Sequence, residues 1–239
     1  MAEKKAPVER KIVRANKSSA ESFQDKQTRK SKASGFRVAA VILWLVAIGF
    51  EVLAILINSG TLYFELFGIK DRFVWVIVAI VLDLICVIIG AQLWKKSNDI
   101  DPASEKNKLK YFLWNNMGVI AAIIALAPLI VIFLKDKKLD AKKKKILVII
   151  AAVALGIAML TGVDWNPASQ EDLEAAQAEI GDGTVYWTAF GKSYHLDPDC
   201  HTLSRSSVIY SGTIEEAFEA NRNDPCDFCA LEEAAEIEE

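Results

Sequence analysis

The sequence VAAVILWLVAIGFEVLAILI occupies residues 38–57 and contains one charged side chain. A helix that crosses a bilayer core of about 30 Å needs roughly 20 apolar residues. Three further apolar blocks follow, at residues 73–93, 113–134 and 146–160. A buried helix of a soluble protein is usually shorter and keeps a polar stripe, which these blocks lack. The blocks predict four transmembrane helices, at about residues 36–58, 73–94, 112–134 and 146–162, within a membrane domain of residues 35–162.

The net charge of −3 conceals a strong asymmetry along the chain. Residues 1–37 carry eleven Lys and Arg against four acids, and residues 1–34 are predicted to form a disordered basic tail because they have no apolar face to bury. Residues 163–239 carry three Lys and Arg against eighteen acids. Such an acidic region repels a phosphate backbone, which disfavours nucleic acid as its partner.

Lysine and arginine counts in the short loops predict the orientation, because cytoplasmic loops are enriched in these residues. Loop 58–72 has two, loop 94–111 has five and loop 135–145 has seven. With four crossings and a cytoplasmic N-terminus, the tail and the second loop place sixteen basic residues inside and leave nine outside. The prediction is a multi-pass protein of the bacterial inner membrane with both termini in the cytoplasm.

An alternative topology has three crossings, with the third apolar block re-entrant and bent near Pro128. It moves the lysine-rich third loop inside and the C-terminus outside. Four crossings are preferred because a re-entrant turn leaves backbone groups unpaired in lipid.

The region after the last apolar block predicts a small α+β module. Residues 163–180 read as a linker and a short acidic helix capped by Ser169. Residues 181–230 contain an alternating stretch and a Gly-Lys turn typical of a β-hairpin, then a capping box that starts a second helix at Thr213. Residues 231–239 are predicted to be an acidic tail. The fold class is therefore mainly α: a four-helix transmembrane bundle with a small α+β C-terminal module.

Four potential metal ligands lie in this module: His195, Cys200, Cys226 and Cys229. A C-x2-C pair supplies two thiolates to one tetrahedral ion, and a nearby Cys and His supply the other two ligands of a closed, structural zinc site. A module of about fifty residues buries too little apolar surface to fold without a cross-link such as a bound zinc ion. A disulfide framework is the alternative, but three cysteines cannot all pair. His201 is the competing nitrogen ligand.

The segments VYWTAFGKSYHLDPDC (185–200), SGTIEEAF (211–218) and DPCDFC (224–229) resemble the metal-binding modules related to the zinc domain of Ada, the DNA methylphosphotriester repair protein. The shared pattern is Tyr-His, a Cys a few residues later, a strand, a helix and a final C-x2-C. The resemblance covers about fifty residues and implies a zinc site with the same four ligands. Ada itself uses four cysteines on a basic domain, so the resemblance does not extend to methyl transfer.

Two acids, Glu51 and Asp83, lie inside predicted membrane helices. A carboxylate at the bilayer centre costs at least about 2.5 kcal/mol, so both are candidate functional residues. At 1.5 Å per residue their depths differ by about 5 Å in an antiparallel pair. They are either hydrogen-bonded across the bundle, with Asn115, Asn116 or Gln92 as candidate partners, or they serve an ion or a proton. Cys86 reads as a small apolar filler.

No catalytic pattern stands out in the sequence. The predicted function is a non-enzymatic membrane protein whose zinc module serves interaction with a protein partner or sensing. The alternative is a small transporter or channel subunit that uses Glu51 and Asp83. A third interpretation makes the module a repair enzyme like Ada.

Overall fold

The computed structural model describes residues 11–14, 22–63, 65, 68–137 and 139–229. These residues form two compact units, each with its own core. The bundle comprises Ser31–Asn98 and Lys106–Trp165. The module comprises the chain before Ser31, Asp99–Glu105 and the chain from Asn166 on.

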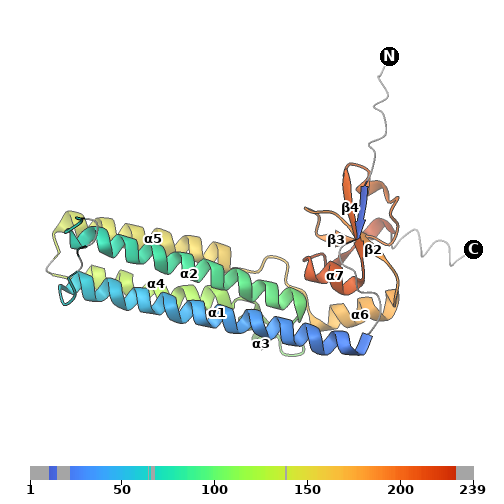
Figure 1. Cartoon of the computed structure of the whole chain (residues 1–239), viewed down its shortest axis with the longest axis horizontal. Coiled ribbons are helices and arrows are strands. Elements are labelled where there is room, and N and C mark those ends of the chain that lie inside the picture. Colours follow the sequence, from blue (N-terminus) through green and yellow to red (C-terminus); the bar gives the residue numbers. More distant parts are fainter. Residues whose placement is uncertain (1–10, 15–21, 64, 66–67, 138, 230–239) are drawn as a thin grey trace, which may run out of the picture. The chain divides into compact units, whose positions relative to one another are not determined.

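The bundle contains four helices that are long and apolar enough to cross a membrane, and a shorter one between the second and third of them. The four long helices lie side by side in Figure 1 and share one apolar core. The predicted fold class is confirmed, and the four helices make the chain a multi-pass membrane protein. In chain order the helices are α1 Ser22–Ser59, α2 Arg72–Ile100, α3 Lys108–Asn115, α4 Met117–Lys135 and α5 Ala141–Gly162.

The third predicted span is divided in the structure. Asn116 separates α3 from α4, and both its side-chain amide and its backbone N–H donate to the Phe112 carbonyl, at 2.9 and 3.1 Å. Pro128 lies inside α4 without ending it. The helix is therefore continuous at the position where the three-crossing alternative bends it.

Small residues form the contacting faces of the helices. Alanines at positions 33, 40, 47 and 54 of α1 recur every seven residues, and all are fully buried. Without a hydrophobic driving force between helices in lipid, close backbone approach stabilises a bundle. One close approach involves Gly118 of α4 and Gly162 of α5. A Cβ added at Gly118 would lie 2.7 Å from the Cβ of Ala91 and 3.2 Å from the Gly162 carbonyl oxygen.

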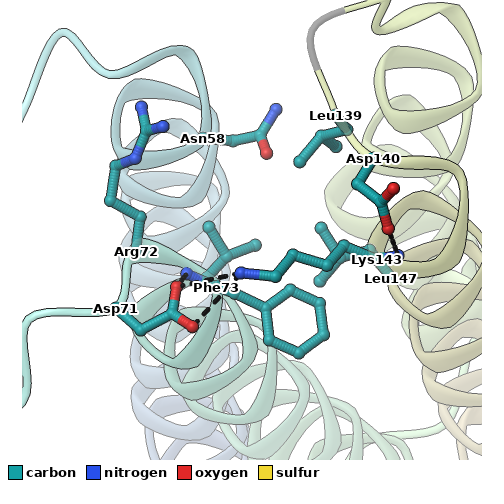
Figure 2. A pocket seen from close by; sticks show the side chains of 9 residues that line it. Asn58, Asp71, Arg72, Phe73, Leu139, Asp140, Lys143 and Leu147 are labelled. Carbon is teal, nitrogen blue, oxygen red and sulfur yellow. Dashed lines mark hydrogen bonds and ion pairs between the residues drawn. The ribbon is translucent and has the colours of Figure 1, made fainter.

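Polar contacts hold one end of the bundle, where the α1–α2 and α4–α5 connections meet. Asp71 accepts from the N–H of Phe73 at 3.0 Å and pairs with Lys143 at 3.2 Å, as Figure 2 shows. Asn58 donates to Asp136 at 2.7 Å. A partly open space of about 150 Å³ lies at this end of the bundle, and we call it the loop cavity. It is lined by Asn58, Asp71, Arg72, Phe73, Val76, Leu139, Asp140, Lys143 and Leu147.

The module combines short strands with two capped helices. Strand β2 (Val185–Trp187) pairs antiparallel with β4 (Val208–Gly212), and β3 (Ser193–Tyr194) pairs parallel with β5 (Asp224–Pro225). The predicted Ser169 cap of α6 (Gln170–Ile180) and the predicted capping box of α7 (Ile214–Glu219) are both present, and the cap at Ser169 is also a capping box. Trp187, Ile214 and Phe218 lie in the apolar core between the sheet and these helices.

An additional strand, β1 (Lys11–Arg14), pairs in parallel with β4, so the sheet order is β1-β4-β2. The prediction of disorder over residues 1–34 is therefore wrong for Lys11–Arg14 and for the residues that begin α1 at Ser22. It failed because strand pairing uses backbone groups and needs no apolar face. Residues 1–10 and 15–21, and the predicted acidic tail at 231–239, lie outside the described residues.

The contact between Gly118 and Gly162 predicts that Gly118→Ala destabilises the bundle by about 1–3 kcal/mol, the usual cost of overpacking. Gly156→Ala is the matched control, because a Cβ at that helical glycine meets nothing within 4 Å. We expect the control to be neutral or stabilising by about 0.5–1 kcal/mol from helix propensity. Thermal unfolding in detergent, followed by circular dichroism, measures both. Equal melting temperatures for the two variants would contradict the close packing.

Candidate metal centre

The module brings together the side chains of His195, Cys200, Cys226 and Cys229. Their ligand atoms all lie within 4.8 Å of one another. Each side chain is at least nine-tenths buried, although three thiols and an imidazole are polar enough to need partners. The described residues contain one such His/Cys/Asp/Glu cluster, and it consists of the four residues that the sequence predicted as ligands.

Backbone pairing sets the positions of two of these residues. Residue His195 follows β3 and exchanges two backbone hydrogen bonds with Tyr186 of β2, at 2.8 and 2.7 Å. The N–H of Cys226 donates to the carbonyl of Tyr194 at 3.0 Å, where β5 leaves its pairing with β3. The last strand thereby carries the C-x2-C pair to the histidine.

A short helical turn places Cys200. The residue precedes the 3₁₀ helix η1 (His201–Leu203), and its carbonyl accepts from the N–H of Leu203 at 2.9 Å. Leu203 is buried beside the cysteines, so its packing holds the turn in place. The buried leucine three residues after the cysteine therefore anchors this ligand.

The separations fit tetrahedral coordination. Four bonds of about 2.3 Å at tetrahedral angles place sulfur atoms about 3.8 Å apart. The Sγ atoms of Cys200 and Cys226 are 4.0 Å apart, and Cys229 Sγ lies 3.8 Å from Nδ1 of His195. A disulfide needs sulfurs at about 2.05 Å, and the described cysteines are all free thiols. The cluster can hold a metal ion such as zinc.

Hydrogen bonds to Cys226 favour the thiolate that a metal requires. Burial alone would raise the pKa of this thiol. The backbone N–H groups of Cys229 and Phe228, with the Thr202 hydroxyl and the Cys200 thiol, more than offset that effect and lower the pKa below its usual value. The turn around the C-x2-C pair thus prepares its first sulfur for coordination.

Burial is the main cause of the pKa shifts of Cys229 and His195. Burial raises the pKa of Cys229 to about 11, although the backbone N–H groups of Asp197 and Leu196 donate to its sulfur. A divalent ion supplies the positive charge that drives such a thiol to deprotonate. Burial lowers the pKa of His195, which favours the neutral imidazole that acts as a metal ligand.

Thr202 is a member of the centre that the sequence analysis did not single out. Its Oγ1 lies 3.1 Å from Cys200 Sγ, 3.4 Å from His195 Nδ1 and 3.8 Å from Cys226 Sγ. Outer-shell groups of this kind orient ligands and tune affinity. Its position two residues after Cys200 is the only sequence signal for it, and a surface threonine has the same signal.

His201 does not join the cluster. Its side chain is exposed, and its ring contacts the edge of Phe228 with centroids 4.4 Å apart. Because η1 begins at His201, the chain turns its side chain away from the buried thiols. The structure thus brings His195 to the cluster and places the competing histidine outside it.

The intramembrane acids occupy the core of the bundle. Asp83 is fully buried and Glu51 is 7% exposed. The three amides considered as their partners bond elsewhere: Asn115 accepts from Asn98, Asn116 donates to Phe112 and Gln92 donates to Thr161. The hydrogen-bonding interpretation therefore lacks these partners.

Comparisons with known proteins identify no family for this chain. No protein-family model matches it, and no curated protein and no solved structure is significantly similar to it. The resemblance to the Ada zinc module therefore rests on the spacing of the four clustered residues and on the short strands and helix between them.

We expect His195→Ala to lose most bound metal and His201→Ala to retain it, because only the first removes a buried ligand atom. Zinc per chain, measured by elemental analysis after purification without added metal, should be close to one in the wild type and in His201→Ala. Cys226→Ser and Cys200→Ser should lose metal to the same degree as His195→Ala. A folded wild-type protein without metal would contradict the assignment, and the reverse order of the two histidine variants would reassign the ligand.

Proposed function

We propose that the chain is a non-enzymatic multi-pass membrane protein whose zinc-stabilised module binds an extended segment of a protein partner. The observation that carries this proposal is the pairing of β1 with β4. The module already accepts a segment that lies far away in the sequence, at the edge of its sheet. Adding a strand to a sheet edge is a common mode of peptide recognition.

The β4 edge holds its occupant mainly through the backbone. The N–H of Lys11 donates to the carbonyl of Ser207 at 3.0 Å, and the register pairs Lys11 with Val208 and Val13 with Tyr210. The side chain of Ile12 is 53% exposed. A strand held by main-chain bonds can be replaced by another of different sequence, which is what a binding edge requires.

Charge favours a basic partner. The segment KIVR adds two positive charges to a region with eighteen acids and three Lys and Arg. The acidic side chains also affect a buried group of the module. Burial and the carboxylates of Glu179 and Asp224 raise the pKa of Tyr194 to about 12. An extended segment with basic and apolar residues is the partner that suits this edge.

Zinc serves the fold in this proposal. Protein ligands fill all four positions of a tetrahedral ion, which leaves none for a substrate or water. The sheet, the C-x2-C turn and η1 meet at the cluster, so metal binding and folding are coupled. The β4 edge then exists only when the module holds its metal.

The same pairing supports four crossings. Strand β1 precedes the first membrane helix and β4 follows the last, while Ala103, between α2 and α3, pairs with Ser169 of the module. Such segments share one side of a membrane only if an even number of crossings separates them. The loop charges favour the cytoplasm of a bacterium as that side. Four crossings place the lysine-rich third loop outside, against the usual charge bias. Part of its charge has local partners there, because Lys143 pairs with Asp71 and Lys144 donates to the carbonyl of Asp136.

The proposed peptide site can be tested with Val13→Pro, a substitution that should weaken the pairing of β1 and so free the edge of β4. Given the Lys11 to Ser207 bond, alternation in a parallel ladder directs the N–H of Val13 toward β4, and proline removes this donor. A fluorescent peptide of residues 9–16 (ERKIVRAN) should then bind the full-length variant about tenfold more tightly than the wild type, whose own strand competes. Fluorescence anisotropy in detergent measures the affinity.

Ile12→Pro is the matched control, because the N–H of residue 12 points away from β4 and proline is tolerated at such edge positions. It should bind the peptide no better than the wild type. A peptide with glutamate in place of its basic residues should bind weakly, and a chelator should abolish binding. Failure of the Val13→Pro protein to bind the basic peptide, with its metal retained, would refute the proposed function.

Reporter fusions test the sidedness. A fluorescent protein fused after residue 239 should fluoresce, and an alkaline phosphatase at the same position should be inactive, because four crossings return the chain to the cytoplasm. Fusions before residue 1 should behave in the same way. Active phosphatase at one end only would mean an odd number of crossings and would also rule out the pairing of β1 with β4.

A further inference from the structure

Glu51 and Asp83 lie at a similar depth beneath the loop cavity. Asn58, which lines the cavity, follows Glu51 by seven residues on α1, and Val76, which also lines it, precedes Asp83 by seven on α2. Seven residues are two helical turns, about 10 Å, and return to the same helix face. The two acids therefore both face the interior of the bundle, from antiparallel helices.

Asp83 has no hydrogen-bond partner in the described part of the chain. Its side chain is fully buried, and neither carboxylate oxygen has a donor. Asp71, which directly precedes α2, differs from Asp83 in this respect. Its carboxylate accepts from the backbone N–H of Phe73 and pairs with the ammonium group of Lys143. A buried carboxylate oxygen without a donor needs a chemical explanation, and protonation of the carboxyl group provides one.

The surroundings supply no positive charge. The apolar core around the acids consists of residues from α1, α2, α4 and α5, and the spans 38–59, 73–94, 117–134 and 146–162 contain no Lys, Arg or His. The other titratable group near Asp83 is the thiol of Cys86, one turn further along α2. Two carboxylates with no cation between them cannot both remain ionised in a low-dielectric core.

A proton suits the pair better than a metal ion. Hard cations take six or more oxygen ligands, and the two acids offer four oxygens at most. The neighbouring buried residues on the same helix faces are Ala47, Ala54, Ile80 and Val87, whose side chains add none. A proton needs only one oxygen and neutralises a charge completely.

We propose that Glu51 and Asp83 form a proton-binding site in the bundle, in which at least one of the two carboxyl groups is protonated at neutral pH and exchanges its proton with water. Binding converts one carboxylate and one proton from water to a neutral carboxylic acid. The polar loop cavity lies two turns away on the same faces and is the entry for the proton. This site is independent of the module and would serve proton-coupled transport.

Infrared spectroscopy of the full-length protein in lipid nanodiscs tests the proposal directly. A protonated carboxylic acid has a carbonyl stretch separate from the bands of carboxylates and amides. We expect this band at neutral pH, where exposed acids are ionised. It should shift when water is replaced by D₂O, and disappear reversibly as the pH is raised.

Asp83→Asn and Glu51→Gln should each change the band, and the double variant should remove it. Glu65→Gln is the control, because this exposed acid pairs with Lys70 at 3.2 Å and contributes no such band. Absence of the band in the wild type would refute the site. A band that does not respond to D₂O would also refute it, since the proton would be locked into the structure. Both outcomes are read from the wild type alone, so they do not depend on the variants folding.

Discussion

The hydrocarbon core of a membrane offers no hydrogen-bond partner, and the bundle is organised by this constraint. Its backbone groups are satisfied within helices, and its helices meet through alanine and glycine because tight packing is the attraction that remains. Polar side chains are concentrated at the ends, where Asp71, Lys143, Asn58 and Asp136 pair with one another. Against this background two buried acids without cationic partners are an exception that needs a chemical reason.

The module meets the opposite problem. Water is available to it, but its chain is too short for apolar burial to outweigh the loss of conformational entropy. The four clustered residues join a hairpin, a 3₁₀ turn and the C-x2-C turn, which come from three separate stretches of the module. The edge of the sheet is formed by β1, which comes from the N-terminal part of the chain. The stability of this unit therefore depends on specific bonds as well as on its small apolar core.

Some features could be predicted from the sequence because they depend on composition or spacing. Twenty apolar residues identify a membrane helix wherever it packs, and the spacing of His195 and the three cysteines identifies a metal site without knowledge of the fold. Strand β1 could not be predicted, since its pairing depends on backbone groups that every residue has. Thr202 was missed for a related reason, because a hydroxyl gains its role only from where the chain places it.

The pairing of β1 with β4 joins residues about two hundred positions apart, so the order of synthesis matters. Lys11 leaves the ribosome first, and Val208 emerges only after all four membrane helices have been made. Strand β1 therefore cannot pair with β4 until the last membrane helix and the module have been synthesised. A chain inserted with one helix missing or reversed would hold the two strands on opposite sides of the bilayer. The β1–β4 pair can therefore form only in a molecule that has both strands on the same side of the membrane.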